Sequence, residues 1–101
     1  MKKKIIAIDQ GTTSSRAVLF DEEGSLLALE QKEFSQSFPS DGWVEHDPEE
    51  IWASVSKVIN DLIRKNSIQD DEIVSIGITN QRETTLVWDR RTGKAVYPAI
   101  V

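Results

Sequence analysis

Two short polar segments hold the residues of this chain whose types and spacing suit chemistry. Residues 9–16, Asp-Gln-Gly-Thr-Thr-Ser-Ser-Arg, follow the apolar run 5–8 and offer a carboxylate, a glycine and small hydroxyls. Residues 80–84, Asn-Gln-Arg-Glu-Thr, follow the apolar run 73–78 and place a guanidinium beside a carboxylate. The first set of groups suits a phosphate and a metal ion, and the second suits a small polyol.

The first segment is well composed for holding a phosphate. Asp9 lies at the mouth of a buried strand, where an unpaired core charge would be costly but a carboxylate can hold Mg²⁺ through water. Gly11 lets the backbone approach a phosphate closely. The remaining donors are Thr12, Thr13, Ser14 and Arg16. No Walker A sequence is present, and the residues alone also allow a polar hairpin turn whose hydroxyls satisfy only the backbone.

The second segment pairs Arg82 with Glu83. The guanidinium donates to hydroxyl oxygens from a fixed fork, and the carboxylate accepts from hydroxyl hydrogens, so together they can read a triol. From these two residues alone, a surface ion pair of small energetic value is the simpler interpretation.

Strands must position both segments. The continuous apolar run 5–8 predicts a central strand buried on both faces, and residues 17–20 predict a second strand. Asp-Glu-Glu-Gly at 21–24 predicts a turn, after which 25–34 returns as a third strand of a meander. Residues 73–78 predict a strand parallel to the first, whose C-terminal end is where α/β proteins bind ligands.

One long helix is expected between the third strand and residues 73–78. After the loop 37–47, Asp47 caps the helix, Pro48 takes its first position and Glu50 completes a capping box. The apolar positions have a helical period: Ile51, Trp52, Val55, Val58, Ile59, Leu62 and Ile63. We expect Trp43 and Trp52 in the core and His46, the only histidine, in a structural role at the helix entrance. Segments 85–89 and 95–101 flank a turn at 90–93, which predicts a hairpin.

Composition bounds the class of protein. The chain has 101 residues, enough for one domain at most, and a net charge of −5, which disfavours a nucleic-acid or anionic-membrane surface. It has no cysteine, hence no disulfide, thiol nucleophile or cysteine zinc site. No apolar run is long enough to span a bilayer, and we expect a cytoplasmic protein. The apolar ending at 97–101 leads us to expect a piece of a longer protein.

Three motifs resemble a known family. The strand followed by Asp-x-Gly-Thr at 9–12 resembles the first phosphate motif of the actin, hexokinase and heat-shock ATPase superfamily. Residues 9–17 are similar to the opening of the carbohydrate kinases, and Gly-Trp-Val-Glu-His-Asp-Pro at 42–48 resembles a segment of the same family. Residues 80–84 resemble the glycerol-binding signature of the glycerol kinases in that family, where sugar kinases usually carry a Gly-Gln motif.

The resemblance implies an α/β, actin-like (ribonuclease-H-like) ATPase domain with a mixed sheet, a strand meander, one long amphipathic helix, then a strand and a hairpin. Residues 1–101 would be the N-terminal part of a first, substrate-binding domain, without the second, nucleotide-binding domain. The implied reaction is ATP-dependent phosphorylation of glycerol to sn-glycerol 3-phosphate. Alternatives are another sugar kinase of the family or a non-catalytic actin-like ATPase module.

The resemblance also assigns roles to individual residues. Asp9 would serve Mg²⁺; Thr12, Thr13, Ser14 and Arg16 the ATP phosphates; and Thr12, Arg82 and Glu83 the glycerol. The general base and further glycerol contacts would lie past Val101, so no catalytic residue is expected here and this piece alone would be inactive. The parent protein would be a homo-oligomer, a dimer or tetramer.

Overall fold

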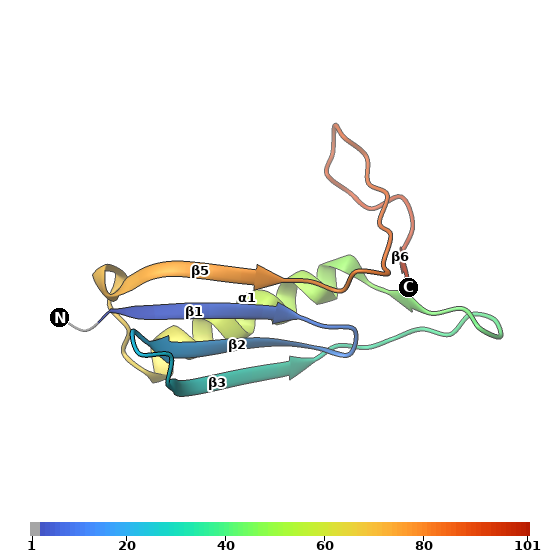
Figure 1. Ribbon diagram of the computed structural model, residues 1–101. Coiled ribbons are helices and arrows are strands. Elements are labelled where there is room, and N and C mark those ends of the chain that lie inside the picture. Colours follow the sequence, from blue (N-terminus) through green and yellow to red (C-terminus); the bar gives the residue numbers. More distant parts are fainter. Residues whose placement is uncertain (1–2) are drawn as a thin grey trace.

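A four-stranded sheet and one helix make up most of the computed structural model, which describes residues 3–101 (Figure 1). Strands β1 (Lys4–Gln10), β2 (Ser14–Asp21) and β3 (Leu26–Glu33) are antiparallel neighbours, as the predicted meander requires. Strand β5 (Ile73–Thr79) pairs parallel to β1, giving the order β3-β2-β1-β5. The mixed sheet and the parallel strand are therefore confirmed.

Helix α1 (Pro48–Lys65) begins where its capping residue predicts. The Asp47 carboxylate accepts a hydrogen bond from the Glu49 backbone N–H at 2.9 Å, and Pro48 opens the first turn. The predicted capping box is wrong, because the Glu50 carboxylate instead accepts from the backbone N–H of Ser35 at 2.7 Å. Glu50 thus ties the helix to the segment that follows β3.

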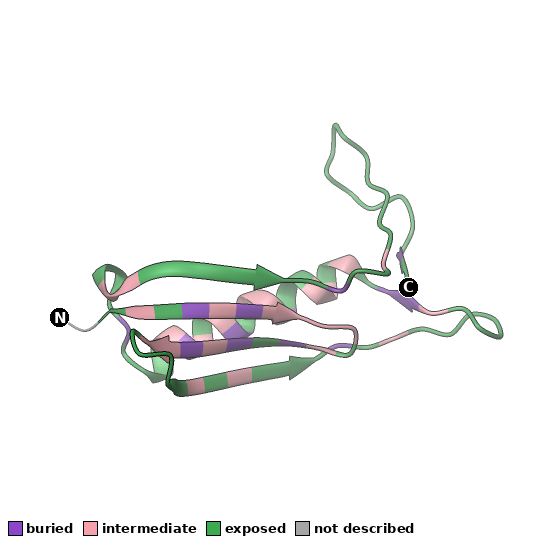
Figure 2. Ribbon diagram, viewed as in Figure 1, coloured by how far each residue is buried: buried purple, intermediate pink, exposed green. Residues whose placement is uncertain are grey.

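The core lies between α1 and one face of the sheet. Its buried residues are Ile6, Ile8, Ala17, Leu19, Val58, Leu62 and Ile68. The prediction that the first strand is buried on both faces is wrong, because the helix covers one face only and leaves Ile5 38% exposed. Strand β5 is exposed over nearly its whole length (Figure 2).

Both tryptophans expected in the core are exposed, Trp43 by 56% and Trp52 by 66%. The buried stripe of α1 is Ser54, Val58 and Leu62, at a spacing of four residues. Trp52 precedes Ser54 by two positions, which at about 100° per residue places it on the opposite side of the helix. Helical periodicity was predicted correctly, but the width of the buried stripe was overestimated.

A second, smaller sheet forms beyond the C-terminal end of the main one. Strand β4 (Glu45–His46) pairs antiparallel with β6 (Ala99–Ile100), and Thr85 bridges to Ile100 on the other side. The predicted hairpin turn is present, with the Asp89 N–H donating to the Lys94 carbonyl at 2.8 Å. A short 3₁₀ turn, η1 (Asp70–Glu72), precedes β5. Within residues 3–101, no helix has the length and apolar character needed to cross a membrane.

Candidate active site

The two polar segments lie at the same edge of the main sheet. Strands β1 and β5 are parallel neighbours, with Ile8 opposite Ile78 and Asp9 opposite Thr79. The turn that follows β1, residues 11–13, and the loop that follows β5, residues 80–84, are named the phosphate loop and the polyol loop after the ligands that the sequence leads us to expect. Because the carboxyl ends of parallel strands share one edge, the two loops emerge side by side (Figure 1).

The phosphate loop is a tight, anchored turn. The Gly11 N–H donates to the Ser14 carbonyl at 2.9 Å, and a Cβ at Gly11 would lie only 3.1 Å from that oxygen. The Thr13 carbonyl accepts from the Phe34 N–H at 3.3 Å, and the Ser14 hydroxyl accepts from the Gln31 amide at 2.8 Å. The end of β3 therefore holds this loop in place.

Asp9 and Arg16 face each other across β1 and β2, and the guanidinium donates to the carboxylate at 2.7 Å. Their side chains are 39% and 45% exposed, so both remain accessible at the sheet edge. Nowhere in residues 3–101 do three histidine or acidic side chains cluster as a metal cage. A single accessible carboxylate fits Mg²⁺, which keeps several waters and binds substrate phosphates, better than an ion that needs an all-protein site.

A direct contact joins the two loops. The Thr12 hydroxyl donates to a carboxylate oxygen of Glu83 at 3.3 Å. Arg82 precedes Glu83 in the chain and is exposed. Among the described residues, Arg82 and Glu83 form no ion pair with each other, so the surface ion pair considered from the sequence is not observed. Of the predicted set, Thr12 and Glu83 are in contact, and Arg82 is exposed in the same loop as Glu83.

The polyol loop depends on a buried residue that sequence analysis did not single out. Gln81 is only 9% exposed, and its side-chain oxygen accepts from the Thr84 hydroxyl at 3.0 Å. The signal in the sequence was an uncharged amide beside two charged residues, Arg82 and Glu83. Gln81 orients inward and thereby leaves its two charged neighbours exposed at the surface.

His46 lies in β4 and is buried, with 1% of its surface exposed. Its Nε2 lies 3.2 Å from the side-chain oxygen of Gln36, to which it donates. Burial lowers the pKa of His46, and the nearby Gln81 side chain and the charge of Glu50 oppose this shift only in part. The expected structural role of His46 is consistent with this burial.

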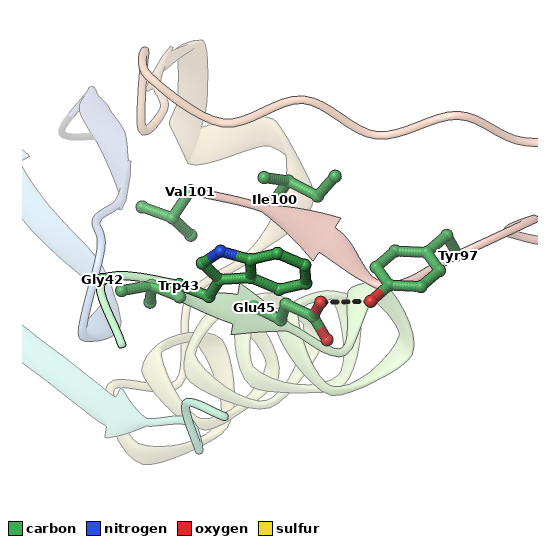
Figure 3. Close-up of a pocket in the computed structure, with 7 residues that line it drawn as sticks. Gly42, Trp43, Glu45, Tyr97, Ile100 and Val101 are labelled. Carbon is green, nitrogen blue, oxygen red and sulfur yellow. Dashed lines mark hydrogen bonds between the residues drawn. The ribbon is translucent and has the colours of Figure 1, made fainter. Parts of the chain in front are cut away.

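The cavity drawn in Figure 3 does not include the predicted site residues. It has a volume of about 440 Å³ and is lined by Gly42, Trp43, Val44, Glu45, Tyr97, Ile100 and Val101. The Tyr97 hydroxyl donates to the Glu45 carboxylate at 2.5 Å, and this hydrogen bond raises the pKa of Tyr97. The candidate site is instead an open edge formed by two loops.

Two curated relatives match all or nearly all of the chain. The glycerol kinase of Clostridium beijerinckii is 59% identical over 101 residues, and that of Fusobacterium nucleatum is 59% identical over 99 residues, 98% of this chain. The chain spans about a fifth (20%) of the length of each.

Solved structures show the same fold. The Plasmodium falciparum glycerol kinase with ADP matches 99% of the chain with a TM-score of 0.87 and 39% identity, and the gluconate kinase of Lactobacillus acidophilus matches 99% with a TM-score of 0.86 and 28% identity. Each match covers 20% of the solved chain. The predicted actin-like α/β fold is confirmed.

The family model for the FGGY carbohydrate kinases, N-terminal domain, matches residues 4–101. This match covers both loops, the helix and the small sheet. The chain belongs to the FGGY family of carbohydrate kinases.

Proposed function

We propose that the longer protein carrying this chain is a glycerol kinase, which transfers the γ-phosphoryl group of ATP to a terminal hydroxyl of glycerol and gives sn-glycerol 3-phosphate and ADP. The observation that carries the proposal is the contact between Thr12 and Glu83, which joins residues 11–13 to residues 80–84. Relatives at 59% identity that are named glycerol kinase support it. Phosphoryl transfer needs these two functions side by side, because it depends mainly on positioning and charge neutralisation.

In this proposal each loop has a distinct task. Arg82 donates to glycerol oxygens and Glu83 accepts from glycerol hydroxyls, which fixes the triol at the edge of β5. Thr12, Thr13, Ser14 and Arg16 bind the ATP phosphates, with Thr12 also in reach of the glycerol through its contact with Glu83. Asp9 holds Mg²⁺, which supplies charge neutralisation on the phosphates when bound. Arg16 exchanges its ion pair with Asp9 for a phosphate oxygen as the nucleotide arrives.

The proposal extends to the whole protein. Residues 1–101 form the N-terminal part of its substrate-binding domain, and a second domain binds most of the nucleotide. The general base comes from a residue past Val101, so this chain alone is inactive or nearly so. We further propose that the enzyme acts in the cytoplasm and is a dimer or tetramer of identical chains.

The polyol loop favours glycerol over a larger sugar. The fold does not discriminate, since a gluconate kinase matches it with a TM-score of 0.86 and a glycerol kinase with 0.87. The preference rests on the resemblance of residues 80–84 to the glycerol-binding signature, and a site in which Arg82 and Glu83 read hydroxyls also rejects deoxy analogues that leave these groups unpaired.

A coupled ADP-release assay on the full-length protein tests the proposal, with glycerol, dihydroxyacetone and xylulose as substrates. We expect glycerol to be preferred. Arg82→Ala should reduce kcat/KM for glycerol by about 100-fold, the effect of losing hydrogen bonds from a charged donor. Arg90→Ala is the matched control, because Arg90 is an exposed arginine in the hairpin turn, away from both loops.

Two outcomes would contradict the proposal. A preference for xylulose would keep the family and refute the role given to Arg82 and Glu83. No turnover with any of the three substrates would support the alternative of a non-catalytic actin-like scaffold or regulatory ATPase module instead.

A further inference from the structure

We infer that His46 is a positioning residue that fixes the spacing between the phosphate loop and the polyol loop. It touches neither substrate, and it would act through the segments that it holds together. The catalytic part of this inference rests on the proposed function, whereas the contacts that support it are observed in the structure. These contacts connect the buried His46 to both loops.

On one side His46 reaches the phosphate loop through Phe34. The Phe34 ring packs edge-on against the imidazole, with ring centroids 5.0 Å apart and an interplanar angle of 78°. The Phe34 backbone N–H donates to the Thr13 carbonyl at 3.3 Å. Phe34 itself is 7% exposed, so its ring has little freedom to move independently of His46.

On the other side His46 reaches the polyol loop through the small sheet. The backbone of His46 pairs with Ala99, and the next residue, Ile100, exchanges backbone hydrogen bonds of 2.8 and 2.9 Å with Thr85. Thr85 immediately follows the polyol loop.

The ring chemistry explains why a histidine suits this place. An apolar ring would pack on Phe34 but could not donate to Gln36, as Nε2 does at 3.2 Å. The other nitrogen, Nδ1, is buried and has no hydrogen-bond partner among residues 3–101. At 1% exposure the ring is too enclosed to take a proton from a substrate hydroxyl, so the role is positioning rather than base catalysis.

Three variants of the full-length protein test the inference. His46→Phe keeps the ring and removes both nitrogens, His46→Gln restores a polar amide, and Val58→Ala is a control that is equally buried but lies between α1 and the sheet, away from the loops. Two properties are measured: kcat and KM for glycerol and ATP, and amide hydrogen exchange in segments 11–14 and 80–85.

We expect His46→Phe to raise the KM for glycerol about tenfold, the equivalent of one lost hydrogen bond, with a smaller change in kcat. Exchange should rise in both loop segments together. His46→Gln should recover most of the KM, and Val58→Ala should lower Tm without changing KM or loop exchange. If His46→Phe does not fold, His46→Gln carries the test and should show an intermediate rise in exchange in both segments.

The inference is overturned if His46 variants lower Tm as Val58→Ala does but leave the exchange of both loops unchanged, or if exchange rises in one loop only. Failure of the proposed function gives a different result. In that case the wild-type protein does not phosphorylate glycerol, while loop exchange still responds to His46→Phe.

Discussion

The part of the chain from β1 to β5 and the part from Asn80 to Val101 are stabilised in different ways. The first part contains every buried hydrophobic residue of the described chain except Ala99. The second part carries large apolar side chains that remain exposed, among them Leu86, Val87, Trp88, Val96 and Tyr97. It is held mainly by backbone hydrogen bonds, such as that from the Val96 N–H to the Val87 carbonyl at 2.9 Å.

This difference separates the two loops of the candidate site. The phosphate loop is built into a packed sheet, where Phe34 and Gln31 anchor it. The polyol loop begins at the exposed strand β5 and continues into a segment with little buried surface. One loop is therefore rigid through the core, and the other depends on a few contacts around Gln81 and His46.

The largest expected effect comes from removing a core side chain. Leu62→Ala should lower the free energy of unfolding of the 101-residue chain by about 3 kcal/mol, because Leu62 is fully buried between α1 and the sheet. Val96→Ala, at a position 69% exposed, should cost less than about 0.5 kcal/mol. Urea unfolding followed by circular dichroism measures both. Equal costs would show that the two parts share one core.

A smaller effect is expected from two glycines with the same backbone conformation. Gly24 and Gly93 lie in exposed turns with φ of 84° and 75°, and neither has an atom that an added Cβ would meet. Gly24→Ala should cost about 1 kcal/mol of unfolding free energy, because its turn joins β2 to β3. Gly93→Ala should leave this energy almost unchanged, because the hairpin opens locally. Similar losses in the two variants would mean that the hairpin unfolds together with the sheet.

The smallest expected effect is a pH dependence at the junction of the two parts. Burial lowers the pKa of His46 below its usual 6.5, so the stability contributed by the neutral ring is complete above pH 6.5 and is lost as the pH falls through the lowered pKa. Urea titrations between pH 7.5 and 5 should show this loss, and His46→Gln should remove it. Asp61 and Glu72 do not contribute to this pH dependence. Hydrogen bonds from Lys57 and Lys4 lower the pKa of the two carboxyls from their usual 3.8 and 4.5, which lie below the pH range of the titration.

The sequence predicted the elements whose signals are local. Asp47 and Pro48 marked the start of α1, Gly24 marked a hairpin turn, and the apolar run 5–8 marked a strand. Residues 80–84 were placed correctly after their strand. Of the segment 9–16 only residues 11–13 form a turn, because β1 continues to Gln10 and β2 begins at Ser14.

What the sequence could not predict was set by partners far along the chain. Glu50 had the spacing of a capping box, but the Ser35 N–H competes for its carboxylate from the far side of the loop. Trp52 matched the helical period, but only the stripe through Val58 meets the sheet. The burial of Gln81 and His46 required knowing that the segment after β3, the entrance of α1 and the polyol loop meet at one place.

The parallel pairing of β1 with β5 also has a consequence in time. β1, β2 and β3 pair with their immediate neighbours, so the phosphate loop can form as soon as the first third of the chain has left the ribosome. Ile78, which pairs with Ile8, is synthesised 70 residues after Ile8. The two loops of the candidate site thus form one after the other. The polyol loop docks last, against a phosphate loop that is already in place.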